Sequence, residues 1–123
     1  MSPRLQLQFE QERYRPGDAV KGTILVLESG GSRSVEALLT YNKKTEDYLD
    51  VATSISSTLH EGDLTTGTSF EFELALPADA LPGYESEHGE LYWEVDAKSD
   101  EAGRDTHDRR RIEVELPPPA ASA

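Results

Sequence analysis

Hydrophobic and polar residues alternate along most of the chain, and this period of two constrains the fold more than any other feature. Successive side chains of a β-strand point to opposite faces, so alternation gives a strand one apolar and one polar face. The clearest case is the segment 70–76, where aromatic and aliphatic residues alternate with Glu71 and Glu73. No segment of useful length repeats with the period of an α-helix. The pattern therefore predicts an all-β protein.

The apolar residues of each alternating segment form the predicted inward face of one strand. In the segment 20–27, residues 24–27 are apolar on both faces, which predicts a central strand or a strand that another segment covers at one end. About seven strands separated by turns predict a two-layer antiparallel β-sandwich of immunoglobulin-like type. The predicted inward positions of the other strands are Leu5, Leu7 and Phe9; Val35, Ala37, Leu39 and Tyr41; Leu49, Val51, Thr53 and Ile55; Phe70, Phe72, Leu74 and Leu76; Leu91, Trp93, Val95 and Ala97; Ile112, Val114 and Leu116.

Glycine and proline mark the connections between these strands. Pro16 presets φ and Gly17 is free to adopt a positive φ, so residues 14–18 are expected to contain a type II turn. Residues 78–88 are interpreted as a loop with a short turn of helix at 78–80, and the polar residues 99–105 as a hairpin-like connection. We expect one domain over residues 1–116 and a mobile Pro/Ala-rich tail over 117–123.

Composition narrows the functional classes. The 123 residues include no cysteine, so disulfides, thiolate metal sites and cysteine nucleophiles are excluded. The absence of a signal-peptide pattern or an apolar span predicts a cytoplasmic protein with no membrane insertion. The formal net charge of −12 repels phosphate, so we expect no nucleic-acid partner. Solubility, or adaptation to a salty cytoplasm, is the simplest explanation of that charge.

Several motifs occur in a fixed order along almost the whole chain. A Tyr-x-Pro-Gly-Asp-x-Val-x-Gly segment comes first, an aromatic strand ending in Leu-Pro follows, and then come a second Leu-Pro and a Leu-Tyr-Trp strand. Together they resemble the amino-terminal domain of arrestins and arrestin-like proteins, including the bacterial sporulation-control proteins. The residues that carry the resemblance are Tyr14, Pro16, Gly17, Asp18, Gly22, Phe70, Phe72, Pro77, Pro82 and Trp93.

The resemblance implies an arrestin-type sandwich that acts as an adaptor. Members of the family usually carry two such sandwiches in tandem, whereas this chain has room for one. A homodimer would provide two sandwiches, with a second copy of the chain in place of the second tandem domain. Only Arg4 precedes the first alternating segment where receptor-binding arrestins carry paired lysines, so phosphate sensing is not implied.

Catalytic and metal-binding patterns are weak. His60, His88 and His107 lie in or beside predicted loops, without the partner spacing of a metal site. Ser54, Ser56 and Ser57 lie in a Ser/Thr-rich strand without a Gly-x-Ser-x-Gly turn. We therefore predict a protein that is not an enzyme and has no cofactor or resident metal. One acidic turn is either solvated or a site for a hard cation such as calcium, and its residues are Asp96, Asp100, Glu101, Asp105 and Asp108.

Aromatic residues offer another candidate surface. Trp93 and Tyr92 are adjacent on a strand, so Trp93 is predicted to be a core residue and Tyr92 to face outward. Tyr92 with Tyr48 or Tyr84 would form a sugar-binding platform, or these residues form ordinary cross-strand pairs. A carbohydrate- or calcium-binding module is therefore the alternative function.

The basic cluster 109–111 and the strand edges complete the candidates. Arg110 is predicted to share a face with Ile112 and to form a structural salt bridge or, alternatively, an anion contact. An edge strand offers unpaired backbone groups to another chain, and residues 5–10 and 49–55 are the candidate edges. We predict a protein-binding domain that recognises an unidentified partner, or its own copy, through such an edge.

Overall fold

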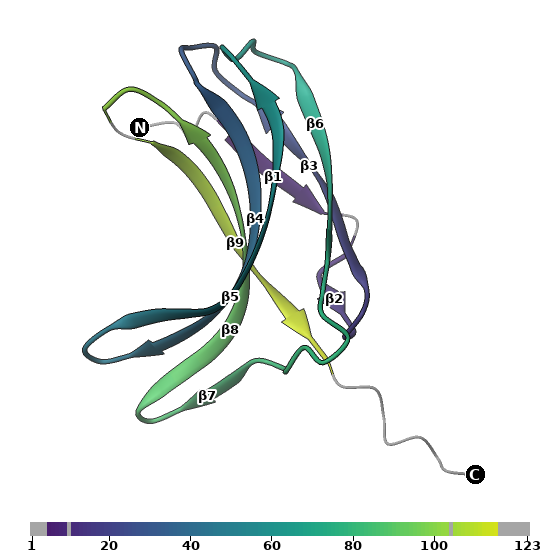
Figure 1. The fold of residues 1–123 in the computed structure, drawn as a ribbon, viewed down its shortest axis with the longest axis vertical. Coiled ribbons are helices and arrows are strands. Elements are labelled where there is room, and N and C mark those ends of the chain that lie inside the picture. Colours follow the sequence, from purple (N-terminus) through teal and green to yellow (C-terminus); the bar gives the residue numbers. More distant parts are fainter. Residues whose placement is uncertain (1–4, 10, 104, 116–123) are drawn as a thin grey trace.

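A computed structural model describes residues 5–9, 11–103 and 105–115 of the chain (Figure 1). These residues form two stacked β-sheets and no helix. The strands are β1 (Leu5–Phe9), β2 (Arg13–Tyr14), β3 (Ala19–Val26), β4 (Ser34–Thr45), β5 (Leu49–Glu61), β6 (Ser69–Ala75), β7 (Tyr84–Ser86), β8 (Gly89–Asp100) and β9 (Thr106–Val114). Arg4, Glu10, Leu116 and the tail 117–123 lie outside the described residues.

The predicted all-β sandwich of two layers is confirmed. A small sheet has the order β1-β3-β6, and a larger sheet has the order β2-β9-β8-β4-β5 with β7 also paired to β8. Strand β3 is central, as the apolar segment predicts. The seven longer strands are the predicted ones, whereas β2 and β7 are additional short strands. Strand β2 pairs with β9 in parallel, so the prediction of purely antiparallel pairing is wrong at that point.

The core fills the space between the two sheets. It takes the alternate side chains of each long strand, and Trp93 is 2% exposed, as predicted for the core anchor. The Trp93 ring packs on Tyr41 with 4.8 Å between ring centroids. The buried aliphatic residues around this pair come from both sheets and include Leu5, Leu7, Val20, Ile24, Leu39, Leu74 and Val95.

Strand β5 departs from simple alternation. A β-bulge interrupts its pairing with β4, because Thr53 lies opposite Tyr41 but Val51 lies opposite Asn42. The extra residue moves Leu49 and Val51 to the face opposite Thr53 and Ile55. Our prediction that these four residues share a face is therefore wrong, and Leu49 and Val51 are exposed.

Two arrestin-type motifs have clear structural roles. Gly17 has φ +85°, and the Asp18 amide donates to the Arg15 carbonyl at 2.9 Å, as expected for the predicted type II turn. Gly22 lies between β1 and β6, where a Cβ would come within 2.5 Å of the Gln8 carbonyl oxygen. Only glycine fits there without a shift of the neighbouring backbone.

The connection between β6 and β8 is held down by core aromatics. Trp93 donates its Nε1–H to the Leu81 carbonyl at 2.7 Å, and the Tyr41 hydroxyl donates to the Pro82 carbonyl at 3.1 Å. The expected turn of helix at 78–80 is instead a β-turn, in which the Ala80 amide donates to the Pro77 carbonyl at 3.1 Å. Strand β7 then follows within the segment that we predicted to be a loop.

Candidate functional site

The sheet order places both predicted edge segments at edges. Strand β1 is one edge of the small sheet, and β5 is one edge of the larger sheet. The two edges differ in their access to a partner. The Leu7 amide of β1 donates to a carboxylate oxygen of Asp108 at 2.7 Å, so a side chain of β9 already occupies part of that edge. Among the described residues, no strand pairs with the outer side of β5.

Strand β5 is a long and mostly polar edge of 13 residues. Thr53 and Ile55 are half-buried toward the core, whereas Ser54 and Ser56 are exposed on the other face. A second bulge interrupts the pairing between Val35 and Glu36 of β4, and between the two bulges residues 53–58 of β5 pair in regular register with β4. At the end of the strand, His60 stacks on Phe70 of β6 with 4.9 Å between ring centroids, which closes the sandwich there.

The β4–β5 hairpin and the β7–β8 turn curve away from the small sheet toward the lower left of Figure 1. Exposed apolar side chains gather on this projecting part of the larger sheet. Tyr48, Leu49 and Val51 belong to β5 or the turn before it, and Tyr84 belongs to β7. The start of the β5 edge is therefore also an apolar surface that the small sheet does not cover.

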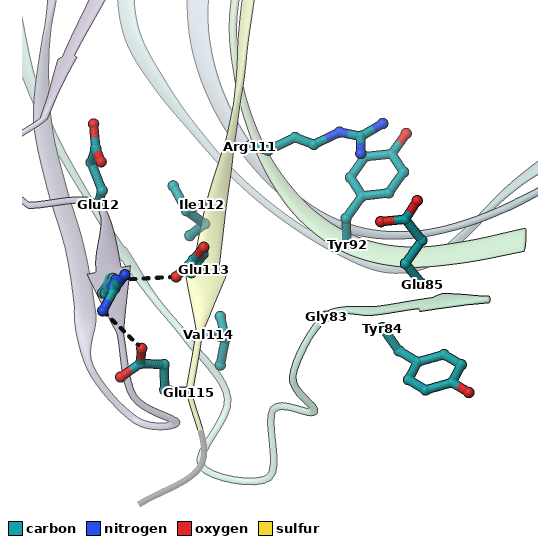
Figure 2. A pocket seen from close by; sticks show the side chains of 11 residues that line it. Glu12, Gly83, Tyr84, Glu85, Tyr92, Arg111, Ile112, Glu113, Val114 and Glu115 are labelled. Atoms are coloured by element: carbon teal, nitrogen blue, oxygen red, sulfur yellow. Dashed lines mark ion pairs between the residues drawn. The ribbon is translucent and has the colours of Figure 1, made fainter.

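A cleft of about 650 Å³ opens where β9 parts from β8 (Figure 2). Pairing between these strands reaches Ile112 opposite Trp93, after which β9 pairs with β2 and β7 takes its place along β8. The lining includes Tyr84, Glu85, Tyr92 and Arg111. Opposite them, Arg13 is paired with Glu113 at 3.1 Å and with Glu115 at 3.5 Å.

Tyr92 faces outward, as predicted, but its ring is not free. The Arg111 guanidinium lies 3.8 Å from the ring centroid and donates to both carboxylate oxygens of Glu90 at 2.9 Å. The hydrogen bond from Arg111 lowers the pKa of Glu90 below its ordinary value. Burial, and then the charge of Glu94, raise the pKa of Tyr92. The arrangement is a stacked ion pair that holds β8 and β9 together at the mouth of the cleft.

The three candidate tyrosines do not share a surface. Tyr84 lies opposite Leu91 in the β7–β8 pairing, so it points away from the face that carries Tyr92. Figure 2 shows the two rings on opposite sides of β7. Tyr48 is 59% exposed at the β4–β5 turn and does not line the cleft. A sugar-stacking platform built from these rings is not assembled.

Arg110 lies opposite Val95, on the face of Ile112, as predicted. It is exposed, and among the described residues it takes part in no ion pair within 4 Å, so the predicted salt bridge is not present there. Its neighbours form the ion pairs instead. Arg109 lies 3.4 Å from Asp96, and Arg111 holds Glu90.

The carboxylates of the acidic turn have separate partners. Asp96 contacts His107 at 3.0 Å, Lys98 pairs with Asp105 at 3.7 Å, and Asp100 lies 3.8 Å from Arg33. The amide of Glu101 bonds to Asp105 and lowers the pKa of that carboxyl group. In the described part of the chain, no three acidic or histidine side chains converge as metal ligands would. The calcium alternative gains no support from this geometry.

Glu94 is a residue that sequence reasoning did not single out. It lies opposite Thr40 and Arg111 on the outer face of the larger sheet. Burial raises its pKa, although Arg109 and Arg111 act in the opposite direction. Its position in the alternating segment predicts an outward side chain, but only the strand register shows which arginine side chains lie near it.

Comparison with known proteins supports the fold alone. No family model matches the sequence, and no curated protein matches it. Among solved structures, the chain is similar to the sporulation control protein Spo0M from Bacillus subtilis, with a TM-score of 0.65 and 22% identity. The match covers 94% of this chain and 50% of the Spo0M chain, so this chain spans about half the length of that structure. Across the residues that the structure describes, no helix is long and apolar enough to cross a membrane.

Proposed function

We propose that this chain is a non-enzymatic, arrestin-like protein-binding domain that acts as an adaptor in the cytoplasm. Its binding surface is the outer edge of β5, where a partner adds an extended segment as a further strand. Recognition then comes from backbone hydrogen bonds along the edge, and selectivity comes from side chains that face the hydroxyl groups and apolar residues of β5.

One observation carries the proposal: β5 is a 13-residue edge strand that pairs with β4 on one side and with no described strand on the other. Unpaired edges are normally blocked by charged residues, prolines or covering side chains. The edge of β1 has such a block in Asp108, whereas residues 51–59 of β5 carry neither a charge nor a proline. The chain therefore protects one edge and leaves the other open.

The chemistry of the remaining surface supports binding over catalysis. The side chains that resemble catalytic or ligand-binding groups are engaged with one another: Arg111 with Glu90, and His107 with Asp96. These contacts stabilise the outer face of the larger sheet. They leave the uncharged part of the β5 edge available to a partner, whereas the edge strand β6 of the small sheet exposes Glu71 and Glu73.

The test is to select extended peptides that bind the domain from a random displayed library and to map each complex by amide hydrogen exchange. We expect a bound peptide to slow the exchange of alternate amides within residues 53–58, because alternate amides of an edge strand point away from the sheet. Phe9 in β1 provides the site for comparison, because its amide, two residues from the outward Leu7 amide, also points away from the small sheet. Selected peptides that protect the cleft or β1 and leave β5 unchanged would contradict the proposal.

A further inference from the structure

We infer that the strand bound at the β5 edge is β5 of a second copy of this chain, the two strands running antiparallel about a two-fold axis at Ile55. The inference rests on the proposed function and names its partner. It yields a symmetric dimer in which the larger sheets of both copies join into one continuous sheet.

Charge is the first argument for a second copy. Each copy carries a net charge of −12, so two copies repel each other, and the repulsion is weakest where the contact itself contains no carboxylates. Strand β6, at an edge of the small sheet, exposes Glu71 and Glu73. Residues 51–59 of β5 are uncharged. Along this edge, two copies can approach without placing like charges opposite each other, which would be destabilising in a strand pair.

Self-complementarity is the second argument. In an antiparallel pair centred on Ile55, Thr53 of one copy lies opposite Ser57 of the other, and Ser54 lies opposite Ser56. Each pair joins side chains of the same face, because Thr53, Ile55 and Ser57 are half-buried while Ser54 and Ser56 are exposed. Hydroxyl pairs and aliphatic pairs directly across two strands are both favourable. The two Ile55 side chains meet on the core side, where they extend the apolar layer.

The bulges set the extent of the pairing. They leave residues 53–58 in regular register with β4, so this is the part of the edge that can accept a straight partner strand. Such a contact is short, and interfaces of this size are weak. We therefore expect a dimer that dissociates in the micromolar range and strengthens with salt, which screens the repulsion between two acidic copies.

Single cysteines provide the test, because the natural chain contains none. Under mild oxidation, Ile55→Cys should form a disulfide with its own copy, since residue 55 lies on the axis. Thr58→Cys, which is exposed on the same strand, should not, because the two copies of residue 58 are about 20 Å apart along the strands. A mixture of Ser54→Cys and Ser56→Cys should cross-link more strongly than either variant alone.

A second test changes the charge of exposed residues, so that it does not depend on replacing the half-buried Ile55 by cysteine. Substituting both Ser54 and Ser56 by lysine places like charges opposite each other and should give a monomer in analytical ultracentrifugation. The glutamate pair should do the same, and mixing the two variants should restore a dimer. Gln8→Lys on the blocked edge of β1 should leave the dimer unchanged.

The outcomes separate this inference from the proposed function. If the natural chain stays monomeric at several hundred micromolar, the inferred dimer is wrong. Protection of β5 by a bound peptide would then still support the proposal that a partner strand binds at this edge. A dimer that persists in the lysine variant, or cross-links centred away from residue 55, also overturns the inference. If no selected peptide protects β5 but the cysteine variants cross-link and the charge variants behave as expected, the proposal that β5 binds another protein is wrong and the dimer is supported.

Discussion

Gly22 shows how little space separates neighbouring strands within the small sheet. It pairs with Phe9 of β1 and with Phe72 of β6, and a Cβ at this position would lie 2.7 Å from the Phe72 ring and closer still to the Gln8 carbonyl oxygen. Backbone atoms cannot move aside as a flexible side chain can. The glycine of the Val-x-Gly motif is therefore required by space, since a positive φ is not involved.

Gly22→Ala is expected to destabilise the protein by about 1–3 kcal/mol, the usual cost of overpacking in a core. Urea denaturation followed by Trp93 fluorescence measures this change. Gly31→Ala is the matched control, because the nearest atom to its Cβ would be an Asp63 oxygen at 4.0 Å, and its effect should stay within about 0.5 kcal/mol. Equal stability of both variants would show that β1 and β6 can separate at little cost.

Glu94 has a raised pKa because burial disfavours its charged form more than Arg109 and Arg111 favour it. A raised folded-state pKa means that Glu94 contributes stability while it is protonated and loses that contribution as the pH rises through the folded value. Its charge therefore destabilises the fold at neutral pH.

Glu94→Gln should make the protein more stable at pH 7, by less than about 1 kcal/mol because the site is partly solvated. The gain should shrink as the pH falls below the ordinary range of glutamate, where the natural side chain is itself neutral. Urea denaturation at pH 4 and pH 7 measures the difference. A variant that is less stable at pH 7 would mean that attraction to the two arginines outweighs desolvation.

At the scale of the strands, alternation was sufficient to place the seven long ones, because each presents one face to the core for several residues. It could not reveal β2 or β7, since strands of 2 and 3 residues show no period. It also missed the bulge in β5, because an extra residue reverses the faces without changing the composition. The central position of β3 was predictable from apolar residues on both of its faces.

The candidate site was less predictable than the strands. The alternation identifies Tyr92 as an outward residue, but the contact of Arg111 with Tyr92 and Glu90 depends on the register of β8 against β9. That register follows from the length of the turn between them and from core packing. Nor does the sequence show that Asp108 reaches the Leu7 amide, because 101 positions separate the two residues along the chain.

Asp108→Ala should weaken the β1 edge. The Leu7 amide loses its charged acceptor, which we expect to cost about 1–3 kcal/mol and to speed exchange of that amide. Hydrogen exchange and urea denaturation measure both effects. Asp50→Ala is the control, because Asp50 is exposed and makes no side-chain hydrogen bond or ion pair within the described residues. Unchanged exchange at Leu7 would show that the carboxylate does not protect this edge in solution.

At the scale of the whole molecule, repulsion between acidic residues destabilises the fold, whereas local ion pairs stabilise it. Carboxylates outnumber basic residues by 24 to 12, yet the ion pairs gather on the outer face of the larger sheet and at the end of β9. Most of these pairs are exposed, and each contributes at most about 1 kcal/mol. Repulsion among the unpaired carboxylates acts over the entire surface.

Raising the NaCl concentration from low to physiological should therefore raise the melting temperature, because screening removes more repulsion than attraction. Calorimetry across a salt series measures the trend. Potassium chloride at equal ionic strength serves as the control and should have the same effect, since screening does not depend on the identity of the cation. A fall in melting temperature would show that the ion pairs dominate.

The pairing of β2 with β9 has a consequence for synthesis on the ribosome. Arg13 and Tyr14 emerge early, but their partners Glu113 and Val114 are among the last described residues to be translated. At about 5–20 residues per second, the nascent chain waits several seconds before the larger sheet can be completed. During that interval β2 has no final partner, whereas β1 can already pair with β3, so slower translation or a chaperone that covers β2 would favour correct assembly.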